Sequence, residues 1–122
     1  MSIDAGDQLH NLTHTRVNIA ASSSGATTLV ALAPAILVGG TSTIQRIRVV
    51  DLWLMANAAV NVKFQSHVAG DITGLMYFAA NGGIVLPYNH LGWFATTGGE
   101  ALDINLSGSV AVGGVLHYVT LT

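Results

Sequence analysis

Five histidines are the residues of this chain with the most obvious capacity for metal or acid–base chemistry. An imidazole ligates transition metals and titrates near neutral pH. His10 and His14 are four positions apart, which would put both on one face of a helix, but no helical pattern surrounds them and no acidic residue completes a zinc-protease motif. His67, His90 and His117 are widely separated in the sequence. We therefore expect no metal site and interpret the histidines as surface or interface residues.

Serines and carboxylates do not form a catalytic pattern either. The serines at positions 22–24 belong to a predicted turn, whereas a catalytic serine elbow joins a strand to a helix. Glu100 falls in a predicted turn and Asp103 at an outward strand position, so we expect both to be solvent-facing charges. The glycine pairs lack the following helix that a phosphate-binding loop requires. The sequence predicts a protein that is not an enzyme, with no cofactor and no small-molecule substrate.

Aromatic residues offer one further kind of site. Trp53, Tyr88, Trp93 and Phe94 could line a carbohydrate-binding platform, because their flat apolar rings can stack on sugars. The alternative places Trp53 in the core and uses Trp93 and Phe94 to anchor a loop or a contact between subunits. We favour the second interpretation and keep host-surface carbohydrate binding as an alternative.

Charge is scarce along the whole chain. Charged residues make up 8% of its 122 residues, against about 25% in an ordinary soluble domain. A surface built from uncharged groups suits permanent contact with other subunits, so we expect a homo-oligomer. The net charge is −2 with only four Lys and Arg residues, and nucleic-acid binding requires a basic face. We therefore expect no nucleic-acid partner.

Membrane insertion and secretion have no sequence signal. The longest apolar stretch, Leu29 to Val38, is interrupted by Pro34 and is much shorter than the roughly 20 residues of a membrane span. Residues 1–7 are acidic and are not followed by the apolar segment of a secretory signal. We expect no membrane contact and synthesis in the cytoplasm.

The elements that must position these residues follow a period of two. We expect strands over 16–19, 27–33, 45–55, 59–65, 72–78, 84–86, 92–94, 102–107 and 110–121. Short strands separated by glycine-rich turns predict an all-β protein, an antiparallel two-sheet β-sandwich with a jelly-roll order as the first choice. Residues 14–122 form this single domain, and residues 1–13, which have no period, form an N-terminal arm.

The strand over 45–55 changes character along its length. Arg46 and Arg48 alternate with apolar neighbours, but from Val50 to Met55 apolar residues occupy both faces. A strand covered on both sides has this pattern. Its second face is therefore expected to lie under a loop or against another subunit.

A series of short blocks in the last two-thirds of the chain carries a resemblance. In order, these include Ile47-Arg48-Val49, Leu52-Trp53-Leu54, Ala59 to Ser66, Ala80-Asn81-Gly82-Gly83, Leu86-Pro87-Tyr88-Asn89, Gly92-Trp93-Phe94 and Asn105-Leu106-Ser107. The series resembles small structural proteins encoded among the virion genes of tailed bacteriophages. The resemblance implies a capsid decoration or cement protein: a small jelly roll, as a dimer or trimer, bound to the major capsid protein on the outside of the head. Tail- or neck-associated virion proteins are the alternative within this class.

Contact residues follow from the arm, the two-sided strand and this resemblance. We expect oligomer or capsid contacts at Leu52, Leu54, Trp93 and Phe94 in the domain and at Asp4, Asp7, Leu9 and Leu12 in the arm. The arm from Asp4 to Thr13 is the expected attachment element.

Overall fold

The fold was analysed in a computed structural model that describes residues 14–32, 36–38 and 41–121. The described residues form twelve strands and no helix. The strands are β1 (Thr15–Ala21), β2 (Gly25–Val30), β3 (Ile36–Val38), β4 (Thr41–Thr43), β5 (Arg46–Ala56), β6 (Val60–Ser66), β7 (Gly70–Asp71), β8 (Met76–Phe78), β9 (Gly83–Leu86), β10 (Phe94–Ala95), β11 (Leu102–Leu106) and β12 (Val112–Leu121). Among these residues there is accordingly no helix of the length and apolarity needed to span a membrane.

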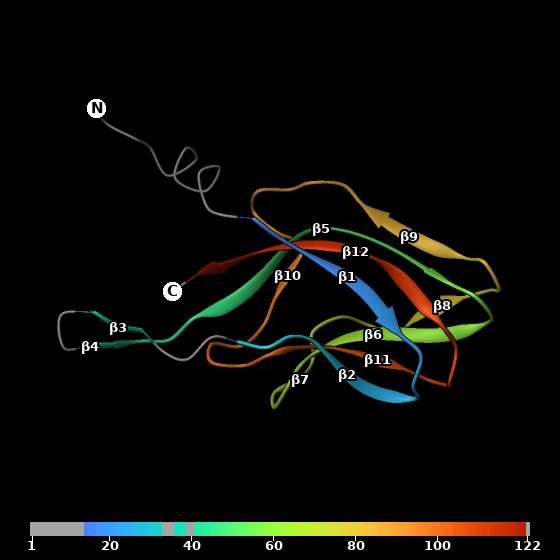
Figure 1. Ribbon diagram of the computed structural model, residues 1–122, viewed down its shortest axis with the longest axis horizontal. Coiled ribbons are helices and arrows are strands. Elements are labelled where there is room, and N and C mark those ends of the chain that lie inside the picture. Colours follow the sequence, from blue (N-terminus) through green and yellow to red (C-terminus); the bar gives the residue numbers. More distant parts are fainter. Residues whose placement is uncertain (1–13, 33–35, 39–40, 122) are drawn as a thin grey trace.

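Two five-stranded sheets lie one above the other (Figure 1). Sheet A has the order β1-β12-β5, and both β9 and β10 pair with the remaining edge of β5. Sheet B has the order β2-β11-β6, and both β7 and β8 pair with the remaining edge of β6. Neighbouring strands are antiparallel throughout. The predicted all-β, antiparallel two-sheet sandwich is thus confirmed.

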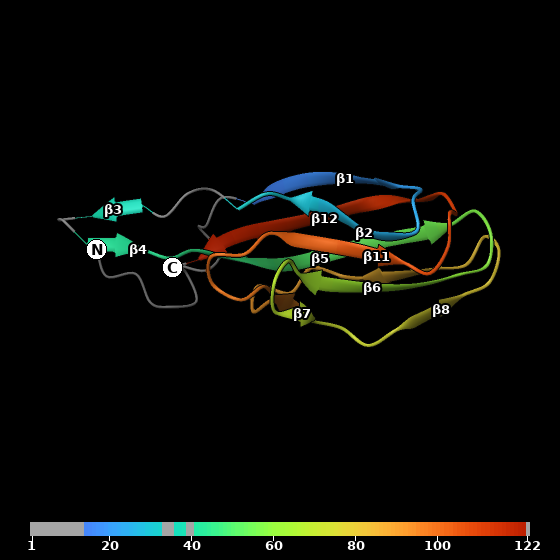
Figure 2. The same ribbon diagram turned by 90° about the horizontal axis from the view of Figure 1, so that it is seen from below.

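A small hairpin extends the molecule at one end. Strands β3 and β4 pair only with each other and project from the sandwich in both views (Figures 1 and 2). The predicted strand over 27–33 is shorter in the structure, because β2 ends at Val30. The hairpin itself was not predicted.

The core lies between the two sheets and is built from alternating inward residues. In β6, Val60, Val62 and Phe64 are buried and alternate with half-buried polar residues, as the sequence predicts. Phe64 is completely buried, and its ring packs against that of Phe94, with 5.0 Å between the centroids. Burying such a side chain contributes roughly 1.5–3 kcal/mol to stability, so this alternation largely fixes which face of each strand points inward.

A β-bulge interrupts the alternation in β5. His117 of β12 is opposite Asp51, but Tyr118 is opposite Val49, so Val50 has no counterpart. Val50 is nonetheless buried, outside the core cluster, where the Asn89 N–H donates a hydrogen bond to its carbonyl oxygen. The loop that contains Asn89 thus contacts β5 at the bulge, whereas Trp53 and Met55 farther along the strand are exposed. The extra residue also reverses which face later residues occupy.

Candidate interaction surfaces

The outward side of sheet A presents an apolar surface next to the bulge. We call it the outer A face, and its residues alternate with the buried ones on four neighbouring strands. It consists of Arg16, Asn18 and Ala20 of β1, Gly113, Val115 and His117 of β12, Asp51, Trp53 and Met55 of β5, and Gly83 and Val85 of β9. Trp53, Met55 and Val85 are 47%, 49% and 73% exposed. Exposed large apolar groups gathered in one patch make this face a candidate interaction surface.

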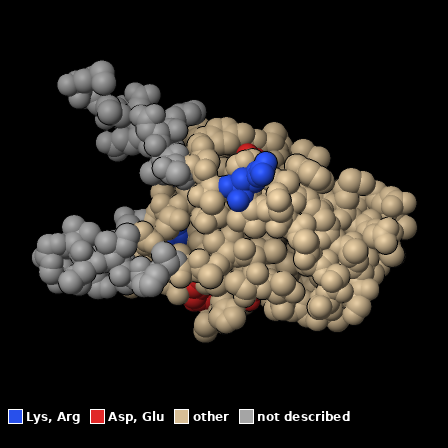
Figure 3. All heavy atoms as spheres, viewed as in Figure 1, with Lys and Arg blue, Asp and Glu red and all other residues tan. Residues whose placement is uncertain are grey.

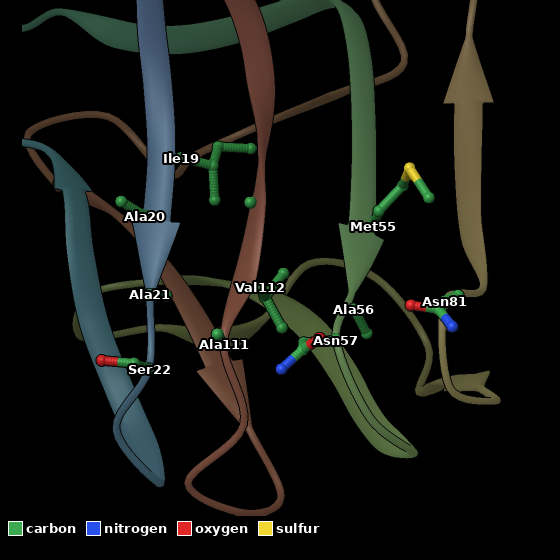
Figure 4. A pocket seen from close by; sticks show the side chains of 11 residues that line it. Ile19, Ala20, Ala21, Ser22, Met55, Ala56, Asn57, Asn81, Ala111 and Val112 are labelled. Carbon is green, nitrogen blue, oxygen red and sulfur yellow. The ribbon is translucent and has the colours of Figure 1, made fainter.

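The outer A face ends in an open hollow of about 470 Å³ (Figure 4). The hollow lies where β1, β12 and β5 meet the turns, and its lining includes the small residues Ala20, Ala111 and Gly113. Met55 stands at its rim on β5 (Figure 4). A second hollow of about 300 Å³ is lined by residues 53–55 of β5 and 83–85 of β9. The face therefore combines projecting apolar side chains with depressions.

A row of polar side chains crosses the same face. Arg16, His117 and Asp51 occupy one level on β1, β12 and β5. His117 Nδ1 lies 2.7 Å from Asp51 Oδ1, and both side chains are about one-third exposed. Arg16 is exposed. The row gives the outer A face one basic and one acidic residue, on opposite sides of β12.

The loop from β9 to β10 carries a second exposed group of large side chains. Tyr88, Leu91 and Trp93 are exposed on it. The Trp93 indole N–H donates to the Pro87 carbonyl oxygen at 2.7 Å, which holds the ring against its own loop. The Tyr88 ring meets the His14 ring edge to face, with 5.4 Å between the centroids. The loop thus reaches the start of β1, as Figure 1 also shows.

The outward side of sheet B is polar instead. Asp71 accepts hydrogen bonds from Gln65 and Lys63, and these lower its pKa, with Gln65 contributing most. Thr28 donates to Asp103 at 2.9 Å, and His67 Nδ1 lies 2.9 Å from the other Asp103 oxygen. Asp103 is only 4% exposed, so the prediction that it is a solvent-facing charge is wrong. The reason is that its neighbours across the sheet cover it with hydrogen-bonding groups.

The two His–Asp pairs place an imidazole against a carboxylate, as catalytic triads do. At His67, however, the nearby Thr28 hydroxyl donates to the carboxylate of Asp103 rather than contacting the imidazole. At His67 the arrangement therefore orients the imidazole through Asp103 and does not place the Thr28 hydroxyl against it. Among the described residues, no three His, Asp or Glu side chains converge into a group that could hold a metal ion.

Glu100 organises the turn between β6 and β7. One of its oxygens, Oε1, accepts hydrogen bonds from the Ser66 hydroxyl and from the N–H groups of Val68 and Ala69, each at 2.7 Å. These bonds lower the pKa of Glu100, chiefly through Ala69 and next through Ser66, because they favour the charged carboxylate. Glu100 therefore holds a turn in place and is more than the free surface charge expected from the sequence.

The predicted contact residues of the domain have different outcomes. Leu52 and Leu54 are 2% and 0% exposed inside the core, so the prediction that they contact another subunit is wrong. Trp53, expected in the core, is exposed between them. Phe94 is half-buried, and its ring packs against Phe64 of the core. Trp93 is exposed on its loop.

The predicted contact residues of the arm, Asp4, Asp7, Leu9 and Leu12, lie outside the described residues.

Comparisons of the chain with models of known protein families, with curated proteins and with solved structures give no match.

Proposed function

We propose that this protein is a non-enzymatic structural component of a tailed-bacteriophage virion, a capsid decoration or cement protein on the outer surface of the head. The observation that carries the proposal is the outer A face, where Trp53, Met55 and Val85 are exposed on a rigid sheet. Figure 3 illustrates how few charged atoms the described residues present on one side of the molecule. Such a surface favours permanent contact with protein. The virion class comes from the resemblance of the sequence blocks.

Cement action needs binding and rigidity but no chemical step. A protein that binds the assembled shell more tightly than free coat subunits stabilises the shell by mass action. Many copies at symmetric positions add modest contacts into a large total effect. In this proposal the arm from Asp4 to Thr13 attaches to the major capsid protein, and the sandwich carries the contacts between copies. The protein is made in the cytoplasm of the host bacterium and ends on the virion.

Strand order supports the same class of protein, and we propose that it is a jelly roll. With the two-residue strands β7 and β10 and the separate hairpin of β3 and β4 set aside, the sheets have the orders β1-β12-β5-β9 and β2-β11-β6-β8. Along the chain, β1 and β2 then lie in different sheets, and the same is true of β5 and β6, of β8 and β9, and of β11 and β12. Two antiparallel sheets joined in this way are typical of jelly rolls.

Binding to isolated shells tests the proposal and the role of the arm. The intact protein should sediment with shells of the major capsid protein and raise the temperature at which they come apart. Deletion of residues 2–12 should weaken binding while leaving the β-sheet circular dichroism unchanged. Equally tight binding by the truncated protein would exclude the arm as the attachment element. Failure of the intact protein to bind shells would contradict the cement function itself.

Copy number separates the head from the tail. Quantitative mass spectrometry of purified virions should find this protein at the copy number of the major capsid protein, or at a simple fraction of it. A few copies per particle would instead place it at the neck or tail, the alternative within the virion class.

The exposed aromatic rings of Tyr88 and Trp93 favour one second candidate, a host-surface carbohydrate-binding module. In that case Trp93→Ala should abolish glycan binding without loss of folding, since the ring would supply a stacking surface. A glycan array with no signal for the intact protein would end this alternative.

A further inference from the structure

We propose that the outer A face binds the same face of a second copy of this chain, around a two-fold axis that runs along β12. The inference rests on sheet register, exposure and charge, and it specifies the contact between copies that the function proposed above assigns to the sandwich. Its tests use no shells, so either proposal can fail alone. A two-fold interface brings one surface patch against itself, so the patch must be complementary to itself in size and charge.

The register of sheet A supplies this complementarity at three levels. On each level a residue of β12 has an outward neighbour on β1 and another on β5, so β12 lies midway between them. The levels are Ala20, Gly113 and Met55; then Asn18, Val115 and Trp53; then Arg16, His117 and Asp51. Small, polar or basic residues stand on the β1 side, and large apolar or acidic residues on the β5 side.

A rotation of 180° about an axis along β12 exchanges these two sides. The β5 side of one copy then faces the β1 side of the other, level by level. Met55 meets Ala20 of the second copy, whose hollow over Gly113 leaves room for a long side chain. Trp53 meets Asn18 in the same way. Each large group therefore faces a small or flexible one, and each such contact occurs twice.

The charged row gives the most specific contact. Arg16 is exposed, and no ion pair of its guanidinium is recorded among the described residues. The rotation places it opposite Asp51 of the second copy, whose carboxylate binds His117 through Oδ1. Facing sheets pack about 10 Å apart, a gap that a long arginine side chain can cross. Arg16 and Asp51 are the only Lys, Arg, Asp or Glu residues of the outer A face, so the pairing leaves neither sign in excess.

The size of the face sets the expected strength. The rotation overlaps three strands, β1, β12 and β5. At a spacing of about 4.8 Å and with about five residues of ~3.3 Å each, they give roughly 240 Å² per copy. A standard interface buries about 800 Å² on each partner. We therefore expect a weak, transient dimer in dilute solution. In an assembly that holds copies close together, the effective concentration would compensate for this weakness.

Sedimentation equilibrium of the full chain, from micromolar to millimolar concentration, tests the dimer. We expect a monomer–dimer equilibrium. Trp53→Glu and Met55→Glu should each raise the dissociation constant of the dimer more than about tenfold, because each variant buries an unpaired charge in the interface. Tyr77→Glu is the control, since Tyr77 is also an exposed large side chain, at 76%, but lies on β8 of the other sheet. A chain that is monomeric throughout, or a dimer as sensitive to Tyr77→Glu as to Trp53→Glu, would overturn the proposal.

Charge reversal tests the orientation of the two copies. Arg16→Glu should weaken the dimer by repulsion from Asp51, and the double variant with Asp51→Arg should restore it. Lys63→Glu on sheet B controls for the change of net charge. No rescue by the double variant would reject the axis along β12, and a trimer would reject two-fold pairing. If circular dichroism shows that Trp53→Glu or Met55→Glu does not fold, the charge-reversal rescue alone tests the dimer. Neither the sedimentation result nor the rescue result bears on shell binding.

Discussion

Two adjacent glycines of β12 differ in the space around them. A side-chain carbon at Gly114 would overlap the Trp53 carbonyl oxygen of β5, whereas at Gly113 the nearest atom, the Ile19 carbonyl oxygen, is 3.6 Å away. We predict that Gly114→Ala lowers the free energy of unfolding by ~1–3 kcal/mol, because the two strands must move apart. Gly113→Ala, the matched control, should change it by less than about 1 kcal/mol.

Urea unfolding followed by tryptophan fluorescence measures both glycine variants. Equal stability of Gly114→Ala and the unchanged chain would contradict the close approach of β12 to β5. A glycine pair inside a strand often indicates a bulge or bend, but the register shift between these strands lies at His117 and Tyr118. The close contact between β12 and β5 therefore explains the glycine at position 114 better than a bulge does.

The lowered pKa of Glu100 predicts that the folded protein loses stability in acid. Its pKa in the folded protein lies below the ordinary value of 4.5, because three donors bind the charged carboxylate. A lowered folded pKa stabilises the native state above the unfolded pKa, and this contribution falls as the pH drops through 4.5 toward the folded pKa. We expect the thermal midpoint to decrease over that acidic window.

Glu100→Gln separates this carboxylate from the others. The variant should be less stable than the unchanged chain at pH 7 and should lose less of its remaining stability between pH 6 and pH 3. Thermal melts across that range measure the difference. Parallel pH profiles for the two proteins would show that Glu100 contributes nothing to acid sensitivity. Asp71, whose pKa is also lowered, contributes equally to both profiles.

At the scale of elements, strand β5 separates core from surface at neighbouring positions. Leu54 is completely buried, so Leu54→Ala should cost about 2–5 kcal/mol of folding free energy through lost contacts and a cavity. Met55→Ala, one residue along on the outer A face, should cost far less, since that side chain is half-exposed. Chemical denaturation compares the two variants. Similar losses for both would contradict the assignment of the two faces.

The same strand explains where prediction from sequence failed. Ile47 and Val49 point inward, and an unbroken alternation from them would put Asp51, Trp53 and Met55 inside and Leu52 and Leu54 outside. The bulge at Val50 reverses this order. The sequence therefore predicted the strand correctly and its second half on the wrong face. Neither composition nor periodicity marks Val50 as the unpaired residue, because the bulge is defined by the pairing of β5 with β12, more than sixty residues later.

At the scale of the whole molecule, the regular strands were predictable and the pairs between them were not. The alternation in β6 and β11 is complete enough to give both strand and face. His117 and Asp51, however, are 66 positions apart, and His67 and Asp103 are 36 apart. Only the strand register brings them together, so the sequence showed five isolated histidines where the structure has two His–Asp pairs.

The last strand closes the sandwich, because β12 pairs with both β1 and β5. We predict that a chain ending at residue 111 does not fold. Loss of β12 removes Leu116 from the core and leaves the facing edges of β1 and β5 unpaired. Deletion of residues 2–12 from the other end is the control and should leave the sheets intact. Circular dichroism and amide hydrogen exchange compare the two truncations. A folded chain of 111 residues would show that β12 is dispensable.

The β1–β12 ladder also determines how the molecule would respond to mechanical force. Thr15 at the start of β1 is opposite Tyr118 near the end of β12, so the chain enters and leaves the domain at the same end (Figures 1 and 2). Hydrogen bonds between antiparallel strands lie perpendicular to the strands. A tension that pulled Thr15 and Leu121 apart would load these bonds one after another, as a zipper is opened. A force applied along the strands would instead load them together, so the sandwich should resist shear better than peeling from its two ends.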